Sequence, residues 1–173
     1  NHPDVARVVL TGSIETAELF ARWRPERPVL AETSGKNALV VTPSADLDLA
    51  VADVVRSAFG HAGQKCSAAS LVILVGSVGD PTTVTGERFR RQLVDAVRSL
   101  AVGPATSLST VMGPLTEPAA GKLERALTTL EPGETWLVPP RRLDEAAGAA
   151  GIDPDRLWTP GLRDGVARGS FFH

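Results

Sequence analysis

Residues 37–75 decide the fold and read NALVVTPSADLDLAVADVVRSAFGHAGQKCSAASLVILV. The stretch begins with one apolar run, Asn37–Thr42, and ends with another, Leu71–Val75. Between them, Asp46–Gly60 carries apolar side chains at helical spacing, at Leu47, Val51, Val54, Val55, Ala58 and Phe59. Strands that are apolar throughout, joined by a helix, are typical of a parallel sheet that is buried on both faces.

The same alternation continues on both sides of this stretch. The pattern predicts three more strands and three more helices: strands at Val5–Leu10, Val29–Ala31 and Trp136–Val138, and helices at Glu15–Arg24, Gly86–Leu100 and Glu117–Leu130. We therefore predict an α/β fold with a mostly parallel, twisted sheet and helices on both faces. In such folds, sites lie beyond the carboxyl ends of the strands.

Composition excludes several classes of protein. A length of 173 residues corresponds to about one domain, and a net charge of −2 lacks the basic footprint of a nucleic-acid binder. No apolar run is long enough to span a membrane. One cysteine and three scattered histidines give neither a disulfide framework nor a metal-ligand spacing, and they favour a reducing cytoplasm. Because the chain starts at Asn1 without a signal peptide, we expect part of a longer protein.

Cys66 is the first candidate for chemistry. A lone cysteine is usually a small buried apolar side chain. Here, however, it stands between Lys65 and Ser67 in a polar segment that follows a predicted helix. An adjacent ammonium group favours the thiolate, which is the nucleophilic form. His61 is a possible base for this thiol, although a histidine at a helix C-terminus also interacts with the helix dipole.

Two further segments follow predicted strands. Glu32 comes directly after Val29–Ala31, where a carboxylate is either solvated or placed at a cleft as a general base. Thr11, Gly12 and Ser13 precede a predicted helix. They form either an ordinary turn with Ser13 as N-cap or a loop whose backbone N–H groups contact a phosphate.

Three motifs occur together in one order: LTGS at 10–13, ETSGKN at 32–37 and GQKCSA at 63–68. In this order and spacing they resemble the aldehyde dehydrogenase superfamily. With the WTPG run at 158–161, the chain is most similar to the 1-pyrroline-5-carboxylate (L-glutamate γ-semialdehyde) dehydrogenases. Domains of that kind also occur in bifunctional proline-utilisation proteins, fused to a flavin-dependent proline dehydrogenase.

The resemblance implies an aldehyde-dehydrogenase-like catalytic domain that uses NAD. Cys66 would be the nucleophile that forms a thiohemiacetal and then a thioester, and its N–H would contribute to the oxyanion hole. Glu32 would activate the water that hydrolyses the thioester. The segment Thr11–Ser13 would lie beside the cofactor pyrophosphate. Lys65 and Ser67 would bind the substrate's α-carboxylate, which agrees with the need for a cation and a hydroxyl near the reacting centre.

The resemblance also divides the chain. Residues 1–31 would be the tail of the dinucleotide-binding domain, and residues 32–173 a truncated catalytic domain. Residues 139–160 have weak periodicity, and we predict a surface insertion there. Ser34 replaces a glycine that is usual in the family, and the chain stops at Phe171–His173, just before an expected cofactor-binding motif.

We therefore expect a catalytic-domain fragment that is inactive by itself, from a parent protein that is a homo-oligomer. Two alternatives remain open: an aldehyde dehydrogenase for another small aldehyde, and a non-catalytic α/β domain with an inert Cys66. The enzyme interpretation requires that Cys66 and Glu32 share one cleft.

Overall fold

The computed structural model describes residues 2–33 and 35–165, so the predictions for Ser34 and for Phe171–His173 lie outside the described residues. The chain forms two compact units, Asn1–Gly35 and Lys36–His173. Each unit is described by itself below. The assignment of the two parts to a dinucleotide-binding and a catalytic domain stays a prediction.

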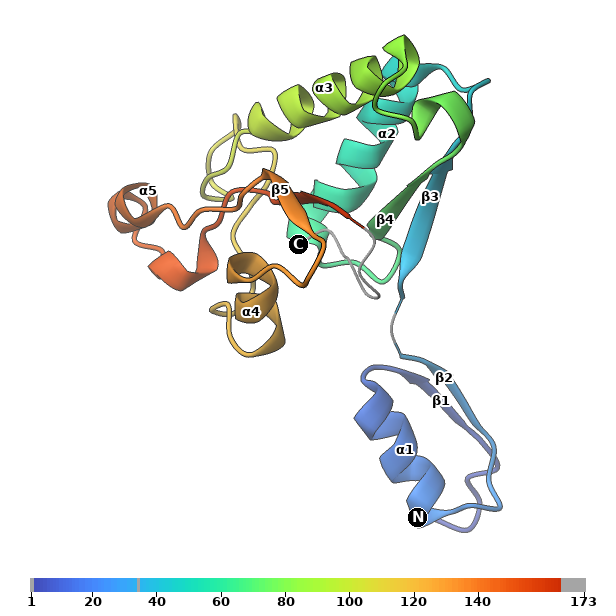
Figure 1. The fold of residues 1–173 in the computed structure, drawn as a ribbon. Helices are drawn as coiled ribbons and strands as arrows, with labels where there is room; N and C mark the ends of the chain where they lie inside the picture. Colours follow the sequence, from blue (N-terminus) through green and yellow to red (C-terminus); the bar gives the residue numbers. More distant parts are fainter. Residues whose placement is uncertain (1, 34, 166–173) are drawn as a thin grey trace. The chain divides into compact units, whose positions relative to one another are not determined.

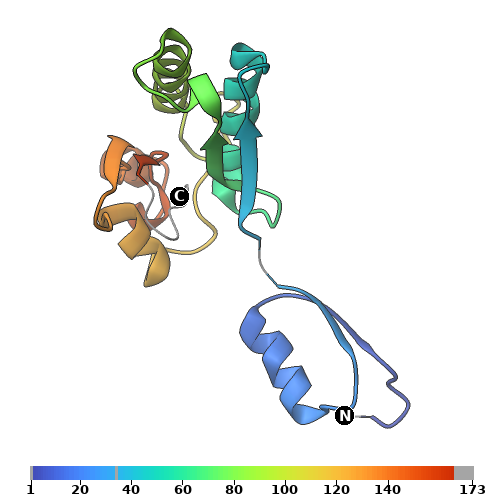
Figure 2. The same ribbon diagram turned by 45° about the vertical axis from the view of Figure 1, so that its right-hand side comes forward.

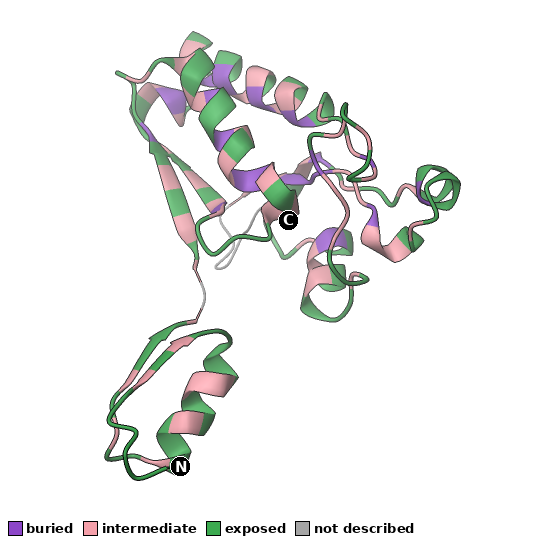
Figure 3. Ribbon diagram, turned by 180° about the vertical axis from the view of Figure 1, so that it is seen from behind, coloured by how far each residue is buried: buried purple, intermediate pink, exposed green. Residues whose placement is uncertain are grey.

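The first unit is a β-α-β unit made of β1 (Val8–Thr11), α1 (Ile14–Trp23) and β2 (Val29–Glu32), with the two strands parallel (Figure 1). The Ser13 side chain caps α1 by accepting a hydrogen bond from Thr16 N at 3.2 Å, as predicted. None of the described residues in this unit is buried, as Figure 3 shows. Two strands and one helix are too few to enclose a core, so the strand predicted as buried has Val9 81% exposed.

In the second unit, β3 (Asn37–Val41) and β4 (Ala69–Leu74) form a parallel ladder (Figure 2), and α2 (Leu47–Phe59) connects them. The helix begins after Asp46, whose carboxylate accepts hydrogen bonds from the backbone N–H groups of the next turn at 3.0 and 3.1 Å. Acidic caps of this kind satisfy N–H groups that lack a partner within the helix. The strand–helix–strand order of residues 37–75 is therefore confirmed.

The main core lies between this ladder, α2 and α3 (Val84–Arg98), which packs on α2. Side chains from one face of the ladder join it, namely Leu39, Val41, Val72 and Leu74. The opposite face, formed by Ala38, Val40, Leu71 and Ile73, is exposed. Within the described residues, α2 thus covers one face of this ladder. The apolar runs had predicted that both faces are buried.

A polar contact joins the two helices. Asp48, in the first turn of α2, accepts hydrogen bonds from Gln92 at 2.6 Å and from Arg88 at 2.8 Å, both on α3. These bonds, with that of Gln92 the larger influence, lower the pKa of the Asp48 carboxyl below its usual range.

The rest of the second unit adds α4 (Lys122–Thr128), α5 (Asp144–Ala149) and an antiparallel pair, β5 (Thr135–Val138) and β6 (Leu162–Asp164). Short 3₁₀ turns lie at Gly60–Gly63, Gly76–Val78 and Pro154–Arg156. The strands of the described residues form three two-stranded ladders, two parallel and one antiparallel. No helix among the described residues is long and apolar enough to cross a membrane.

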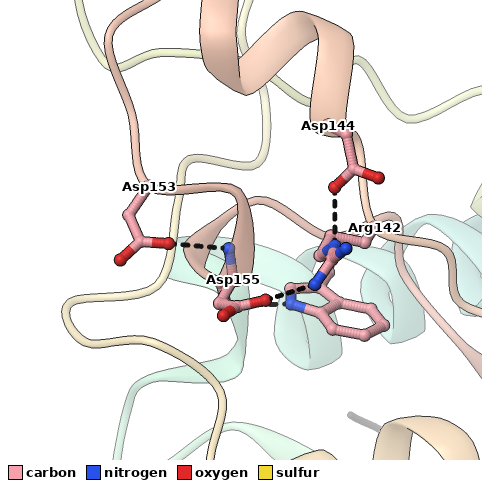
Figure 4. A network of polar contacts seen from close by, with 5 residues as sticks. Arg142, Asp144, Asp153 and Asp155 are labelled. Carbon is pink, nitrogen blue, oxygen red and sulfur yellow. Dashed lines mark hydrogen bonds and ion pairs between the residues drawn. The ribbon is translucent and has the colours of Figure 1, made fainter.

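Residues 139–160, where we predicted a surface insertion, have a defined fold. Arg142 donates hydrogen bonds to Asp144 and Asp155, each at 2.6 Å, and Asp153 caps the next turn (Figure 4). Hydrogen bonds to these two carboxylates raise the pKa of Arg142. Leu157 is fully buried, at 0% exposure. The segment is therefore packed against the unit rather than loosely attached, and its status as an insertion stays a prediction.

Candidate functional site

The segment before Cys66 has an unusual backbone. After α2 ends at Phe59, His61 (φ 54°), Ala62 (φ 55°) and Gly63 (φ 69°) are all in the left-handed region. Only glycine adopts this conformation without strain, so His61 and Ala62 cost about 1–3 kcal/mol each. The His61 carbonyl accepts hydrogen bonds from the backbone and side chain of Gln64, at 3.1 and 2.9 Å, which hold the run in place.

Cys66 lies on a tight turn. Ala68 N donates a hydrogen bond to the Lys65 carbonyl at 3.1 Å, so Cys66 and Ser67 are the two central residues of a four-residue turn. The Cys66 thiol is free and exposed, not buried in an apolar interior. Lys65 and Ser67 are exposed as well. The turn therefore leaves the thiol accessible to a reactant, with Lys65 and Ser67 as its neighbours in the chain.

Side chains from three parts of the second unit fix this turn. Gln64 accepts hydrogen bonds from the backbone and hydroxyl of Thr116, at 2.9 and 3.1 Å. Ser57 of α2 accepts one from Ala69 N at 3.2 Å. Asn37, the first residue of β3, donates from its amide to the carbonyls of Cys66 and Ala68. From the sequence, Asn37 was expected only as part of a motif and as the start of an apolar run, with no role of its own.

A hollow of about 360 Å³ lies beside the turn. Lys65 and Ser67 both line it, together with Asp53, Arg56 and Ser57 of α2. Two cations and two hydroxyls against one carboxylate give this hollow a net positive lining. It is suited to an anionic group beside the turn, although Cys66 itself is not among the residues that line it.

In the first unit, the other predicted site residues come together at the carboxyl ends of β1 and β2. Thr11 is paired with Glu32 across the ladder, and Gly12 N donates a hydrogen bond to the Glu32 carbonyl at 3.2 Å. The carboxylate-bearing residue Glu32 is exposed at this edge. The parallel pairing thus brings the candidate base beside the candidate cofactor loop, as expected for sites at strand ends.

The loop of Thr11, Gly12 and Ser13 fits a dinucleotide pyrophosphate. It is exposed and leads into the N-terminus of α1, where the first backbone N–H groups lack helical partners and favour an anion. A Cβ on Gly12 would lie 3.3 Å from Leu10 Cδ1, so glycine keeps this turn open. Glu15, in the first turn, is the one acidic residue there.

Cys66 and Glu32 belong to different units, so their sharing of one cleft stays a prediction. The first unit holds the candidate base and the candidate cofactor loop, and the second holds the candidate nucleophile with Lys65 and Ser67. In the described residues, no three His, Cys, Asp or Glu side chains come together as a metal site.

Comparison with known proteins identifies the family. The sequence profile of the aldehyde dehydrogenase family matches residues 1–134. The chain belongs to the aldehyde dehydrogenase family. This confirms the resemblance drawn from the three motifs, and it confirms the α/β fold class. Among curated relatives, 1-pyrroline-5-carboxylate dehydrogenase of Geobacillus sp. (strain WCH70) is 37% identical over 128 residues, which cover 69% of this chain and 24% of that protein.

Solved structures of aldehyde dehydrogenases support the same fold. Proline Utilization A from Corynebacterium freiburgense is 58% identical with a TM-score of 0.82, over 98% of this chain and 16% of that one. A methylmalonate-semialdehyde dehydrogenase from Sinorhizobium meliloti 1021, solved with NAD, is 28% identical with a TM-score of 0.77, over 96% and 33%. The chain therefore spans a third or less of the length of each of these three proteins.

Proposed function

We propose that this chain is the nucleophile-bearing part of an NAD-dependent aldehyde dehydrogenase that oxidises L-glutamate γ-semialdehyde to glutamate in proline catabolism. One observation carries the proposal: in a chain of this family, Cys66 is exposed on a turn that side-chain hydrogen bonds fix in place. A thiol fixed in this way is prepared for attack on a bound carbonyl group.

In the proposed reaction, the Cys66 thiolate attacks the aldehyde carbon, a C–S bond forms, and the carbonyl oxygen gains negative charge. The Cys66 N–H donates a hydrogen bond to that oxygen. NAD, when bound with its pyrophosphate at Thr11, Gly12 and Ser13, supplies the hydride acceptor for the oxidation to the thioester. Glu32 then takes a proton from a water molecule that attacks the thioester carbon. The C–S bond breaks, which releases the carboxylic acid product and restores the Cys66 thiolate.

The decisive variant is Cys66→Ala in the whole protein. Aldehyde oxidation should be lost, because the proposed thiohemiacetal and thioester form on the Cys66 sulfur. In the wild type, the exposed Cys66 thiol should react with an alkylating agent, and this reaction should abolish aldehyde oxidation. Retained oxidation in Cys66→Ala would exclude the enzyme interpretation and favour a non-catalytic α/β domain.

The isolated residues 1–173 should be inactive, and turnover by that piece would contradict the expectation of an incomplete site.

We propose that Lys65 and Ser67 bind the α-carboxylate of the substrate. The positively lined hollow beside the turn supports this assignment. Lys65→Ala should raise the KM for glutamate semialdehyde by about tenfold, because it removes a charge-assisted hydrogen bond, while the KM for propionaldehyde changes little. Lys122→Ala, on α4, is the matched control and should change neither value. Equal effects of Lys65→Ala on both aldehydes would remove Lys65 from substrate recognition.

A second candidate substrate is another small semialdehyde. The similarity to the Sinorhizobium protein, whose name specifies methylmalonate semialdehyde, supports it at 28% identity. The ratio of kcat/KM for glutamate semialdehyde and methylmalonate semialdehyde in the whole protein distinguishes the two.

We also propose that the whole protein is a cytoplasmic homo-oligomer with a fused, flavin-dependent proline dehydrogenase domain. The 58% identity to a Proline Utilization A supports the fusion. Thiol chemistry on a lone cysteine fits a reducing compartment. Proline-dependent reduction of a dye by the purified whole protein tests the fused activity, and light scattering tests the oligomer.

A further inference from the structure

The Asn37 amide contacts the backbone of the proposed nucleophile. Its Nδ2 donates to the Cys66 carbonyl at 2.7 Å and to the Ala68 carbonyl at 3.0 Å. Asn37 is half-buried and opens β3, while its two acceptors lie at the entrance to β4. One side chain thus joins the start of one strand to the turn before the next.

The geometry matches the chemistry of an amide. Cys66 and Ala68 are two positions apart in the chain, and one NH₂ group carries two hydrogens, one for each carbonyl. A serine hydroxyl at this position would supply one donor, and an aspartate would supply none and would place negative charge against two carbonyl oxygens. The ladder also shifts register between Asn37 and Ala38, so backbone pairing alone does not continue regularly to the turn.

We propose that Asn37 is a positioning residue that fixes the orientation of the Cys66 peptide and, through it, the direction of the thiol. This inference rests on the proposed function, in which Cys66 is the nucleophile. The other anchors act outside the turn: Gln64, before it, accepts a hydrogen bond from Thr116 N, and Ser57 accepts one from Ala69 N after it. Among the described residues, the Asn37 side chain donates a hydrogen bond directly to a backbone atom of Cys66.

The test compares Asn37→Asp and Asn37→Ser in the whole protein, with kcat expressed per Cys66 thiol titrated. Small displacements of a reacting group are costly, so Asn37→Asp should lower kcat at least about tenfold and leave the KM for NAD within about twofold. Asn37→Ser, with one donor left, should give an intermediate kcat. The rate of Cys66 alkylation should fall in the same order.

Gln92→Ala is the matched control, because it removes an amide hydrogen bond between α2 and α3, away from the turn. It should leave kcat per thiol unchanged. If Asn37→Asp changes only thermal stability, and kcat per titrated Cys66 stays within about twofold of wild type, Asn37 has no positioning role. Should Asn37→Asp fail to fold, Asn37→Ser decides on the same criterion. Cys66→Ala separates the two proposals: retained activity there refutes the proposed function, whereas lost activity together with an unaffected Asn37→Asp refutes only this inference.

Discussion

Glu134 and Arg163 form a buried ion pair in the second unit. Arg163 Nη1 lies 3.0 Å from Glu134 Oε2. The Arg163 side chain is 8% exposed and the Glu134 side chain is 1% exposed. The guanidinium carbon of Arg163 also lies 4.4 Å from the ring centre of Trp136. Two nitrogens of Arg163, Nε and Nη2, are buried without a hydrogen-bond partner among the described residues. The pair is therefore a costly arrangement that depends on both charges being present.

Arg163→Met should destabilise the protein by about 3 kcal/mol, because it removes one charge of a buried ion pair. Urea denaturation measures the loss. Arg91→Met, which breaks an exposed ion pair with Glu87, is the control and should cost less than about 1 kcal/mol. Equal losses in the two variants would show that burial adds nothing to the Arg163 pair.

Contacts between near neighbours could be predicted from the sequence, and contacts between distant residues could not. The cap at Ser13 was expected because the side chain bonds a backbone N–H three positions on. The bond from Asn37 to Cys66 joins residues 29 positions apart and depends on the ladder between β3 and β4. The left-handed backbone at His61 was missed as well, because its sequence carries no glycine signal there and surrounding contacts impose the strain.

At the scale of elements, α3 contains a glycine that its neighbours require. A Cβ on Gly86 would lie 2.0 Å from the Asp80 carbonyl oxygen and 3.0 Å from that of Ser77, and both atoms belong to the backbone. This close approach lets the loop before α3 fold against the first turn of the helix. The usual preference for alanine over glycine inside a helix should therefore be reversed at this position.

Gly86→Ala should destabilise the protein by about 2 kcal/mol or more, since backbone atoms must move to admit the methyl group. The thermal unfolding midpoint measures the effect. Gly148→Ala in α5 is the matched control: a Cβ there meets nothing within 4 Å, so alanine should stabilise by up to about 1 kcal/mol. If Gly86→Ala stabilised the protein, the loop before α3 would have to move away from the added methyl group at little cost in free energy.

The type of each element, helix or strand, was predicted better than its burial. Both strands of residues 37–75 and the helix between them were expected, and they form within two residues of the predicted bounds. The strand predicted at Val5–Leu10 exists as β1 but is not buried. A run of apolar residues predicts that a strand is buried. It does not predict which other segment buries it, because that depends on the rest of the fold.

For the whole molecule, the informative feature is the exposed apolar face of the β3–β4 ladder. Val40 is 55% exposed and Ile73 42%, and the two are paired across the ladder. Side chains of this kind on both faces are typical of strands in the middle of a larger α/β protein. Since the chain spans 24% of the Geobacillus relative, most of such a protein lies outside residues 1–173.

We therefore expect Val40 to be accessible in isolated residues 1–173 and protected in the whole protein. In a Cys66→Ser background, the thiol of Val40→Cys should react with a maleimide about tenfold more slowly in the whole protein, because a covered side chain reacts only when the structure opens. Mass spectrometry of the peptide that contains residue 40 measures this rate separately from any other cysteine. Val84→Cys, at an 84% exposed position that begins α3, should react at similar rates in both. If Val40→Cys reacts equally fast in the two proteins, the apolar runs of residues 37–75 do not reflect burial on both faces. A sheet buried on both faces would then be the wrong prediction for this ladder, although the family assignment, which rests on sequence, would stand.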